Sequence, residues 1–159
     1  MEKFINMKKI IILSLLFCVF ININAQKVYR GNSIMNSDIV CTFDGKHLYN
    51  GNSSFTSDII ITFDGHYIYA GYSTMNGDII CTWSGNRLYR GNSTMSSNIL
   101  ATYLNGNIYR GNSIMTSNIV YNYKHKIVYL ENSSMTSDII LRTSNYIHPA
   151  ILTFILIVL

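Results

Sequence analysis

The chain has 159 residues, of which 48% are hydrophobic and 12 are Tyr, and its 12 basic and 8 acidic side chains give a formal net charge of +4. Residues 1–25 carry three of the basic and one of the acidic side chains, so the remainder holds nine and seven, a balance of about +2. The basic residues form no stripe and are not interleaved with the aromatic ones, which argues against nucleic acid as a partner.

The N-terminal 25 residues have the pattern of a secretory signal peptide. Lys3, Lys8 and Lys9 precede an apolar run over residues 10–23, and Ala25 then offers a small residue for cleavage. The run is short for a membrane-spanning helix, so cleavage is favoured over a membrane anchor. The expected location of the protein is therefore outside the cell or at the cell surface.

From Tyr29 onward the sequence repeats with a period of twenty residues, without insertion or deletion. Six copies in one register predict a tandem array in which each unit buries its apolar face against its neighbours. The recurring positions are Tyr29, Tyr49, Tyr69, Tyr89, Tyr109 and Tyr129; Ser33, Ser53, Ser73, Ser93, Ser113 and Ser133; Met35, Met75, Met95, Met115 and Met135, with Phe55 as the substitute; and Ile39, Ile59, Ile79, Ile99, Ile119 and Ile139.

Each unit has the composition of a β-hairpin. The stretch Asp58–Phe63 is rich in β-branched and aromatic residues, which fit a pleated, half-buried surface. Asp64-Gly65 follows as a two-residue turn, because tight hairpin turns need positive φ. A short second strand ends in Ile68-Tyr69, and a connection that opens with Gly-Asn-Ser or a close variant leads to the next hairpin.

Pairing across this Asp-Gly turn fixes the predicted faces of the hairpin. Phe63 would oppose His66, and Ile60 would oppose Tyr69. Ile59 would then share a face with Phe63, while Ile60 would share the other face with Tyr69. Both faces are fairly apolar, which predicts that the hairpins pack on both sides or meet a partner on one.

The first and last segments of the repeat region depart from the pattern. Residues 26–30 are expected to form a lone strand that pairs with the first hairpin. The fourth turn, Asn105-Gly106, comes one residue later than the Asp-Gly slot, and the fifth turn, Lys124-His125-Lys126, has no Gly. The sixth unit has His148-Pro149 where an aliphatic-Tyr pair is expected. Atypical terminal units are typical of arrays whose ends cap the stack.

The C-terminal segment Ala150–Leu159 is nearly all apolar and is too short to span a bilayer as a helix. Its strong β character predicts a buried closing strand, with a self-assembling or membrane-contacting segment as the alternative. The chain is therefore divided into a signal peptide (1–25), a β-hairpin repeat domain (26–146) and an apolar capping strand or tail (147–159).

The side chains that could support metal or cofactor chemistry do not form a site. The four His residues fall at different repeat positions and in no zinc-type spacing, so no metal or cofactor is expected. One carboxylate column is interrupted by Asn at two positions, which fits an Asx turn or strand-entry cap better than a metal or acid-base role. The column is Asp38, Asp58, Asp78, Asn98, Asn118 and Asp138.

The two cysteines of the repeat domain, Cys41 and Cys81, lie at the same unit position two repeats apart. An open array would separate them by roughly 19 Å, far beyond the about 7 Å that a disulfide allows between Cα atoms. No disulfide is expected. The chain also lacks a nucleophile elbow and a Gly-rich phosphate loop, so a non-enzymatic protein is predicted.

The column of Tyr residues is the main functional lead. Aromatic faces with polar tips suit sugar rings or quaternary ammonium groups, whereas the alternative is that these rings pack between hairpins. We expect a non-enzymatic protein that binds a surface glycan or cell-wall polymer, or alternatively a structural, self-assembling surface protein. The candidate ligand-binding residues, expected to line one side of the array, are Tyr49, Tyr69, Tyr89, Tyr109 and Tyr129.

Three hairpin-repeat families resemble the chain. Choline-binding repeats of cell-wall proteins have a similar length and an aromatic-rich hairpin. Tyr89-Arg90-Gly91 resembles the Tyr-x-Gly of MORN repeats, and the strand-Asp-Gly-strand unit over Thr62–Ile68 resembles the beta-flower proteins. The resemblance covers the hairpin shape across residues 29–143 and carries over no site. The expected fold is all-β, either an open solenoid or a closed ring of six hairpins.

Overall fold

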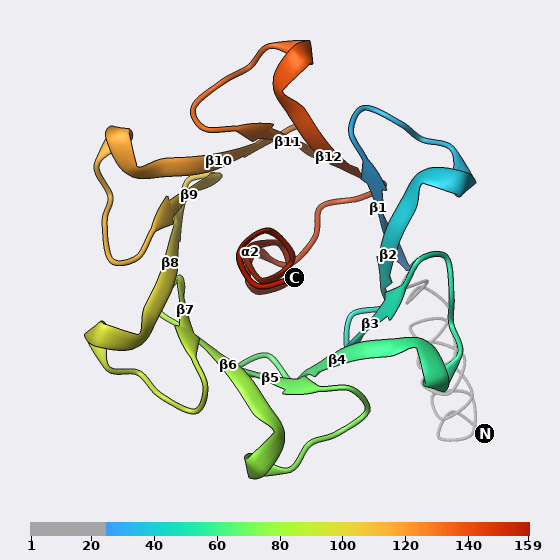
Figure 1. The fold of residues 1–159 in the computed structure, drawn as a ribbon, viewed down its shortest axis with the longest axis vertical. Coiled ribbons are helices and arrows are strands. Elements are labelled where there is room, and N and C mark those ends of the chain that lie inside the picture. The colour runs from blue at the N-terminus through green and yellow to red at the C-terminus, as the bar shows by residue number, and fades with distance from the viewer. Residues whose placement is uncertain (1–24) are drawn as a thin grey trace, which may run out of the picture.

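A computed structural model describes residues 25–159, and in it twelve strands form one closed antiparallel barrel. The closed ring, one of the two expected arrangements, is confirmed (Figure 1). The expected signal peptide lies outside the described residues except for Ala25. The strands are β1 (Gln26–Arg30), β2 (Ile39–Phe43), β3 (His47–Asn50), β4 (Ile59–Phe63), β5 (Tyr67–Ala70), β6 (Ile79–Ser84), β7 (Arg87–Arg90), β8 (Ile99–Leu104), β9 (Asn107–Arg110), β10 (Ile119–Lys124), β11 (Ile127–Leu130) and β12 (Ile139–Thr143).

Tight turns join the two strands of each hairpin, but their register differs from the prediction. Phe63 pairs with Ile68 and not with His66. Asp64 lies before the turn because its carboxylate accepts hydrogen bonds from the backbone N–H groups of His66 at 2.8 Å and Tyr67 at 2.6 Å. The turn therefore begins one residue later than the Asp-Gly pattern indicates.

The fourth and fifth hairpins turn at the same unit positions as the others. Leu104 pairs with Asn107, so Asn105-Gly106 occupies the ordinary slot and the predicted drift of this unit is wrong. In the fifth hairpin, His125 and Lys126 have φ angles of 50° and 65°, a region that residues other than glycine rarely adopt. Strand pairing, rather than local turn preference, therefore holds this turn in place.

A register shift recurs where each hairpin pairs with the next one. Leu48 pairs with Ile61 and Tyr49 pairs with Ile59, which leaves Ile60 as the extra residue of a β-bulge. Ile60 packs against the interior core, whereas Ile59 lies opposite Tyr49. The predicted faces of Ile59 and Ile60 are therefore wrong, because one inserted residue reverses the alternation of side chains along a strand.

The sixth hairpin is assembled from both ends of the repeat domain. β1 pairs with β2, as expected, and also with β12, where Val28 lies opposite Thr143. Val28 and Tyr29 thus supply the aliphatic-Tyr pair of the sixth unit. His148-Pro149 was expected at this place, but the chain has already left the barrel wall there. The ring closes without a free strand edge.

The barrel interior holds the main hydrophobic core, and side chains fill it rather than leaving a channel. Inward-facing residues of the strands and the C-terminal segment form one buried cluster. Equivalent inward positions carry different residues in different units, so the interior is less regular than the backbone. Two such sets are Phe43, Phe63, Trp83, Tyr103 and Tyr123, and Cys41, Ile61, Cys81, Ala101, Tyr121 and Leu141.

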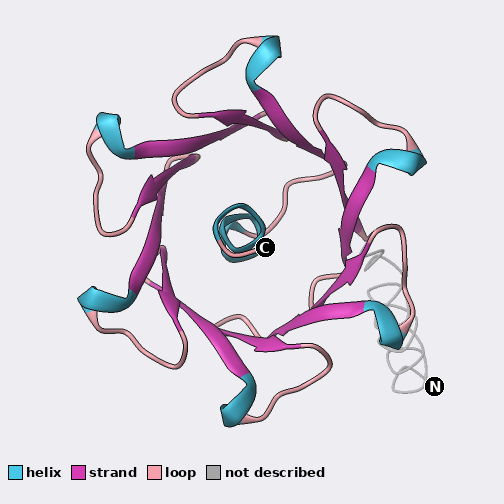
Figure 2. Cartoon of the chain, viewed as in Figure 1, coloured by secondary structure: helices cyan, strands magenta, loops and turns pink. Residues whose placement is uncertain are grey.

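The apolar C-terminal segment is a helix inside the barrel, so the prediction of a closing strand is wrong. α2 (Pro149–Ile157) lies at the centre of the ring, as Figure 2 shows. Residues 150–155 are all buried, as expected for a helix that is apolar on every side. Because the closed barrel offers no free strand edge, a segment in its apolar interior satisfies its backbone hydrogen bonds by forming a helix.

Local signals mark the start of α2. Pro149 occupies the first turn, and the backbone N–H of Ala150 donates to His148 Nδ1 at 3.2 Å. Thr153 is fully buried, and its hydroxyl has no hydrogen-bond partner among residues 25–159. Within residues 25–159, no helix combines the length and the apolar character that a membrane span requires.

Candidate functional site

The connections between successive hairpins project outward from the ring, and we call them petals (Figure 2). Each petal ends in a short 3-10 helix that leads into the next strand. These helices are η1 (Asn36–Asp38), η2 (Thr56–Asp58), η3 (Asn76–Asp78), η4 (Ser96–Asn98), η5 (Thr116–Asn118) and η6 (Thr136–Asp138).

A Ser side chain braces each petal. In the third petal the backbone N–H of Met75 donates to Ser73 Oγ at 3.2 Å, and the Ser73 hydroxyl donates to the Asp78 carboxylate. Where Asn replaces Asp, the direction is reversed, since Asn98 Nδ2 donates to Ser93 Oγ at 2.8 Å. The Asp/Asn column thus contributes to structure, as predicted, although its partner is the Ser hydroxyl rather than the backbone of an Asx turn.

The residue before each 3-10 helix is apolar and exposed, and we call these six residues the petal tips. Their exposed fractions lie between 64% and 72%. The repeat marks these positions in the sequence, but recurrence alone does not distinguish exposed from buried residues, so sequence reasoning did not select them. The petal tips are Met35, Phe55, Met75, Met95, Met115 and Met135.

The Tyr residues expected to bind a ligand lie opposite outward-facing residues of the neighbouring strands and are largely covered. The first four are at most 9% exposed, and the fifth is half-buried. They are spread around a closed ring, one in each hairpin, instead of along an open array. The five residues are Tyr49, Tyr69, Tyr89, Tyr109 and Tyr129.

In the first two hairpins the Tyr hydroxyl is engaged inside the protein. Tyr49 donates to Asp44 Oδ2 at 2.9 Å, and the second hairpin repeats this contact at 2.8 Å. Burial and the Asp44 carboxylate raise the pKa of Tyr49. Burial acts to raise the pKa of Asp44, but hydrogen bonds from the backbones of His47 and Lys46 and from Tyr49 hold it below its ordinary value. These groups brace the hairpin.

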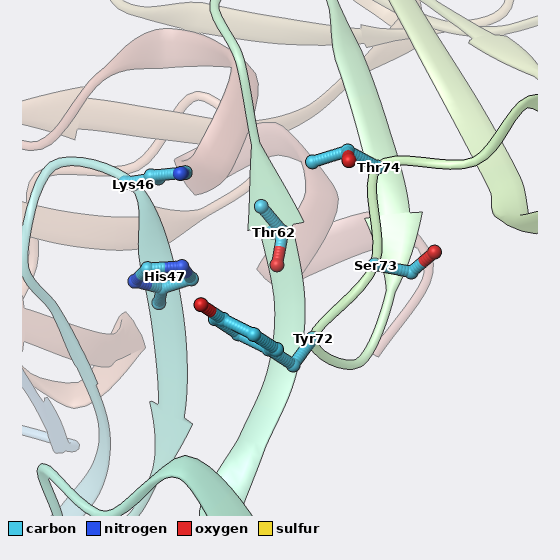
Figure 3. Close-up of a pocket in the computed structure, with 6 residues that line it drawn as sticks. All are labelled: Lys46, His47, Thr62, Tyr72, Ser73 and Thr74. Atoms are coloured by element: carbon cyan, nitrogen blue, oxygen red, sulfur yellow. The ribbon is translucent and has the colours of Figure 1, made fainter.

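One cavity on the outside of the ring has the chemistry of a binding site, and we call it the Tyr72 cavity (Figure 3). It has a volume of about 190 Å³ and lies where β3 and the turn before it meet β4 and the third petal. His47 pairs with Thr62 across the two strands, and Thr62 Oγ1 donates to the Gly71 carbonyl at 2.8 Å, which anchors the petal. Its lining residues are Lys46, His47, Thr62, Tyr72, Ser73 and Thr74.

Two groups in the Tyr72 cavity lack partners within the described residues. His47 Nδ1 lies 3.2 Å from Asp44 Oδ2, whereas His47 Nε2 is buried without a hydrogen-bond partner. Lys46 is exposed, and its ammonium group makes no ion pair or hydrogen bond in the described part of the chain. The Tyr72 ring is 70% exposed, and its centroid lies 5.5 Å from that of His47. The cavity therefore combines an aromatic face with free polar groups.

The Tyr72 cavity exists because one petal departs from the repeat. The position of Tyr72 is Asn in the other five petals. In two of these, the Asn accepts a hydrogen bond from an Arg of the barrel wall: Arg87 Nε donates to Asn112 at 2.9 Å, and Arg142 Nη2 donates to Asn32 at 2.6 Å. Sequence reasoning missed the site, although an aromatic residue in an Asn column was the available signal.

The two cysteines of the repeat domain, Cys41 and Cys81, are buried in the barrel interior and form no disulfide within the described residues. Burial raises the pKa of Cys41 to about 12 and that of Cys81 to about 11. Both thiols are therefore protonated at neutral pH and pack as small apolar side chains. In residues 25–159, no group of three or more His, Cys, Asp or Glu side chains is placed to hold a metal ion.

The fold defines a class of protein: a closed ring of six hairpin units with petals on the outside. The chain belongs to the family described as 6-fold beta flower protein, which it matches over residues 28–153. Of the three resemblances drawn from the sequence, the one to the beta-flower proteins is thereby confirmed. No curated protein and no solved structure matches the chain.

Proposed function

We propose that this protein is a non-enzymatic, exported module that binds a surface glycan or cell-wall polymer. The observation that carries this proposal is the Tyr72 cavity, which sets an exposed aromatic ring beside free polar groups. Sugars present apolar ring faces and a rim of hydroxyl groups, so they suit such a combination. The signal peptide pattern of residues 1–25 supports a location where such polymers occur.

The proposed site differs from the Tyr column that the sequence favoured. Tyr69 is 5% exposed and its hydroxyl is engaged by Asp64, whereas Tyr72 is 70% exposed. Binding through Tyr72 needs no rearrangement of the barrel wall. The petal is also braced before any ligand arrives, because Ser73 contacts both Met75 and Asp78. A fixed site of this kind loses little conformational entropy on binding.

A glycan array tests this proposal. The full chain should bind a subset of polysaccharides, and Tyr72→Asn, which restores the residue of the other petals, should weaken that binding by about tenfold. Phe55→Asn removes a ring that is equally exposed on another petal and should leave binding unchanged. Binding to no glycan, or equal loss in both variants, would contradict a sugar site at Tyr72.

A second candidate function is self-assembly through the petal tips. Six exposed apolar side chains stand at equivalent places around the ring and would give a second copy of the chain six equivalent contact points. The tail, which the sequence suggested for this role, is less suited because residues 150–155 of α2 are buried.

Light scattering on the full chain distinguishes this second candidate from a purely monomeric binding module. Replacement of Met75, Met95 and Met115 by Ser should dissociate an assembly that the wild type forms, whereas replacement of the same three residues by Leu should preserve it. A wild type that is monomeric at high concentration would eliminate self-assembly through the tips.

A further inference from the structure

We infer that the Tyr72 cavity takes a single sugar ring that carries a carboxylate, with the carboxylate paired to Lys46. This inference rests on the proposed glycan-binding function and names the class of sugar. Three groups of the described chain that lie together in the cavity support it: the Lys46 ammonium, which forms no ion pair, His47 Nε2, which has no hydrogen-bond partner, and the exposed Tyr72 ring.

The size of the cavity limits the ligand to about one ring. Its volume of about 190 Å³ lies below the roughly 300–1,000 Å³ typical of pockets for drug-sized molecules. A longer stretch of polymer would have to leave the cavity along the outer surface. The site is therefore suited to one residue of a glycan, held against the Tyr72 ring.

The charged groups at the cavity include one, the Lys46 ammonium, that can pair with an anionic ligand. Lys46 is the positively charged lining residue without an ion pair. Two carboxylates lie nearby, but both are already engaged: Asp44 accepts from two backbone N–H groups and from Tyr49, and Asp78 accepts from the Ser73 hydroxyl. The Lys46 ammonium consequently has no internal partner that a sugar carboxylate would have to displace.

His47 supplies the complementary contact to a sugar hydroxyl. Asp44 Oδ2 lies 3.2 Å from His47 Nδ1, so in the neutral ring it favours the tautomer with the proton on Nδ1. His47 Nε2 is then an acceptor that is buried and unsatisfied. A sugar hydroxyl reaches this buried nitrogen only after the His47 ring turns toward the cavity, and the hydrogen bond would then remove the free-energy cost of leaving the nitrogen unsatisfied.

The pairing of a basic turn residue with an aromatic petal residue occurs once in the described ring. The turn position of Lys46 is His66, Asn86, Gly106 and Lys126 in the following hairpins, and Lys126 Nζ donates to the Ser144 carbonyl at 3.3 Å. Only beside Lys46 does a turn cation meet an aromatic residue at the start of a petal. The inference therefore predicts one ligand per chain, despite six similar units.

Titration calorimetry with three probes tests the inference: galacturonic acid, galactose and sodium acetate. The wild type should bind one equivalent of galacturonic acid about five to ten times more tightly than galactose. Lys46→Gln should remove this preference while galactose binding persists. Lys124→Gln, which removes the same charge from an exposed position on another hairpin, should keep the preference intact.

The outcomes separate this inference from the proposed function. Equal affinity for galactose and galacturonic acid, or a preference that survives Lys46→Gln, would overturn the inference and leave glycan binding in place. Acetate binding as tight as galacturonic acid would also overturn it, because the cavity would then recognise an anion without the sugar. If neither sugar binds and the glycan array is also negative, the proposed function itself fails.

Discussion

The barrel interior and the petals are built from the same repeat, yet they differ in how strictly they keep it. On the petals, Ser recurs in all six units and Met in five. Inside the barrel, one inward position reads Phe, Phe, Trp, Tyr, Tyr and Thr, and another reads Cys, Ile, Cys, Ala, Tyr and Leu. At these two inward positions the core is less regular than the petals, whereas a third inward position is aliphatic in every unit: Val28, Leu48, Ile68, Leu88, Ile108 and Val128.

The central helix explains this difference. A helix of 3.6 residues per turn has no sixfold symmetry, so the six units cannot all meet the same surface of α2. Close packing then requires a different side chain from each unit. The petals project away from the central helix (Figure 2), and the Ser-centred hydrogen bonds recur from petal to petal. The repeat is retained in the petals because their stabilising hydrogen bonds lie within a single unit.

The contrast between core and petals can be tested by introducing one charged residue in the core and, in a second variant, one on a petal tip. Leu152→Asp should lower the free energy of unfolding by about 3–5 kcal/mol or prevent folding, because Leu152 is fully buried in α2. Met115→Asp, on a petal tip, should change it by no more than about 0.5 kcal/mol. Urea unfolding followed by circular dichroism measures both, and similar losses in the two variants would contradict the assignment of core and surface.

The bracing of the petals can be tested with two serines of the fifth petal. Ser113→Ala should cost about 1–2 kcal/mol, because Ser113 Oγ accepts from the Met115 N–H at 3.1 Å and from Asn118 Nδ2 at 2.7 Å. Ser117→Ala removes an exposed hydroxyl of the same petal and should be neutral within about 0.5 kcal/mol. Thermal unfolding compares the two variants, and equal stabilities would show that the Ser contacts do not brace the petal.

One substitution should have opposite signs in the helix and in the barrel wall. Thr153→Val should stabilise the protein by about 1 kcal/mol, since it removes a buried hydroxyl without a partner. Thr102→Val should destabilise it by about 1 kcal/mol, since Thr102 Oγ1 donates to the Gly111 carbonyl at 2.8 Å. The same chemical change in both places makes unfolding midpoints directly comparable. Destabilisation by Thr153→Val would mean that its hydroxyl is satisfied in solution.

The smallest expected effect concerns the start of the sixth petal, where Glu131 stands at a glycine position. Its φ of 53° matches the 59° of Gly111. Glu131→Gly should therefore stabilise by about 0.5–1 kcal/mol, and Gly111→Glu should destabilise by a similar amount. A Cβ at Gly111 would meet its nearest neighbouring atom at 3.9 Å, so backbone strain is the expected cause. Calorimetric unfolding gives both values, and equal signs would contradict the strain argument.

Sequence reasoning recovered the period, the hairpins and a closed ring as one of two alternatives, because these follow from local composition. It missed the register, since the backbone contacts of Asp64 and the extra residue Ile60 are local details that shift pairing by one or two positions. It missed α2 because β-branched and large apolar residues fit a buried strand equally well. The choice between strand and helix follows from the closed barrel, because it leaves no free strand edge with which this segment could pair.

The candidate site was less predictable than the fold. His47 and Tyr72 lie 25 positions apart, and the pairing of β3 with β4 and the anchoring of the petal by Thr62 bring them together. Residues so far apart in the sequence do not form a short motif, so the sequence alone does not indicate this contact. The Tyr column, in contrast, is conspicuous in the sequence because every hairpin needs a covered aromatic residue at that place.

The barrel can close only after its last strand, β12, has been made, because β12 pairs with the first strand, β1. Lys27 and Ser144 are 117 positions apart, yet their backbones are hydrogen-bonded in the finished seam. During synthesis, β1 is the first strand to be made, and one of its edges stays unpaired until β12 follows. Closure of such a long loop is slow, and an open edge invites pairing with other chains. Chains in which β12 has not yet paired with β1 are therefore the form of this protein most exposed to misassembly.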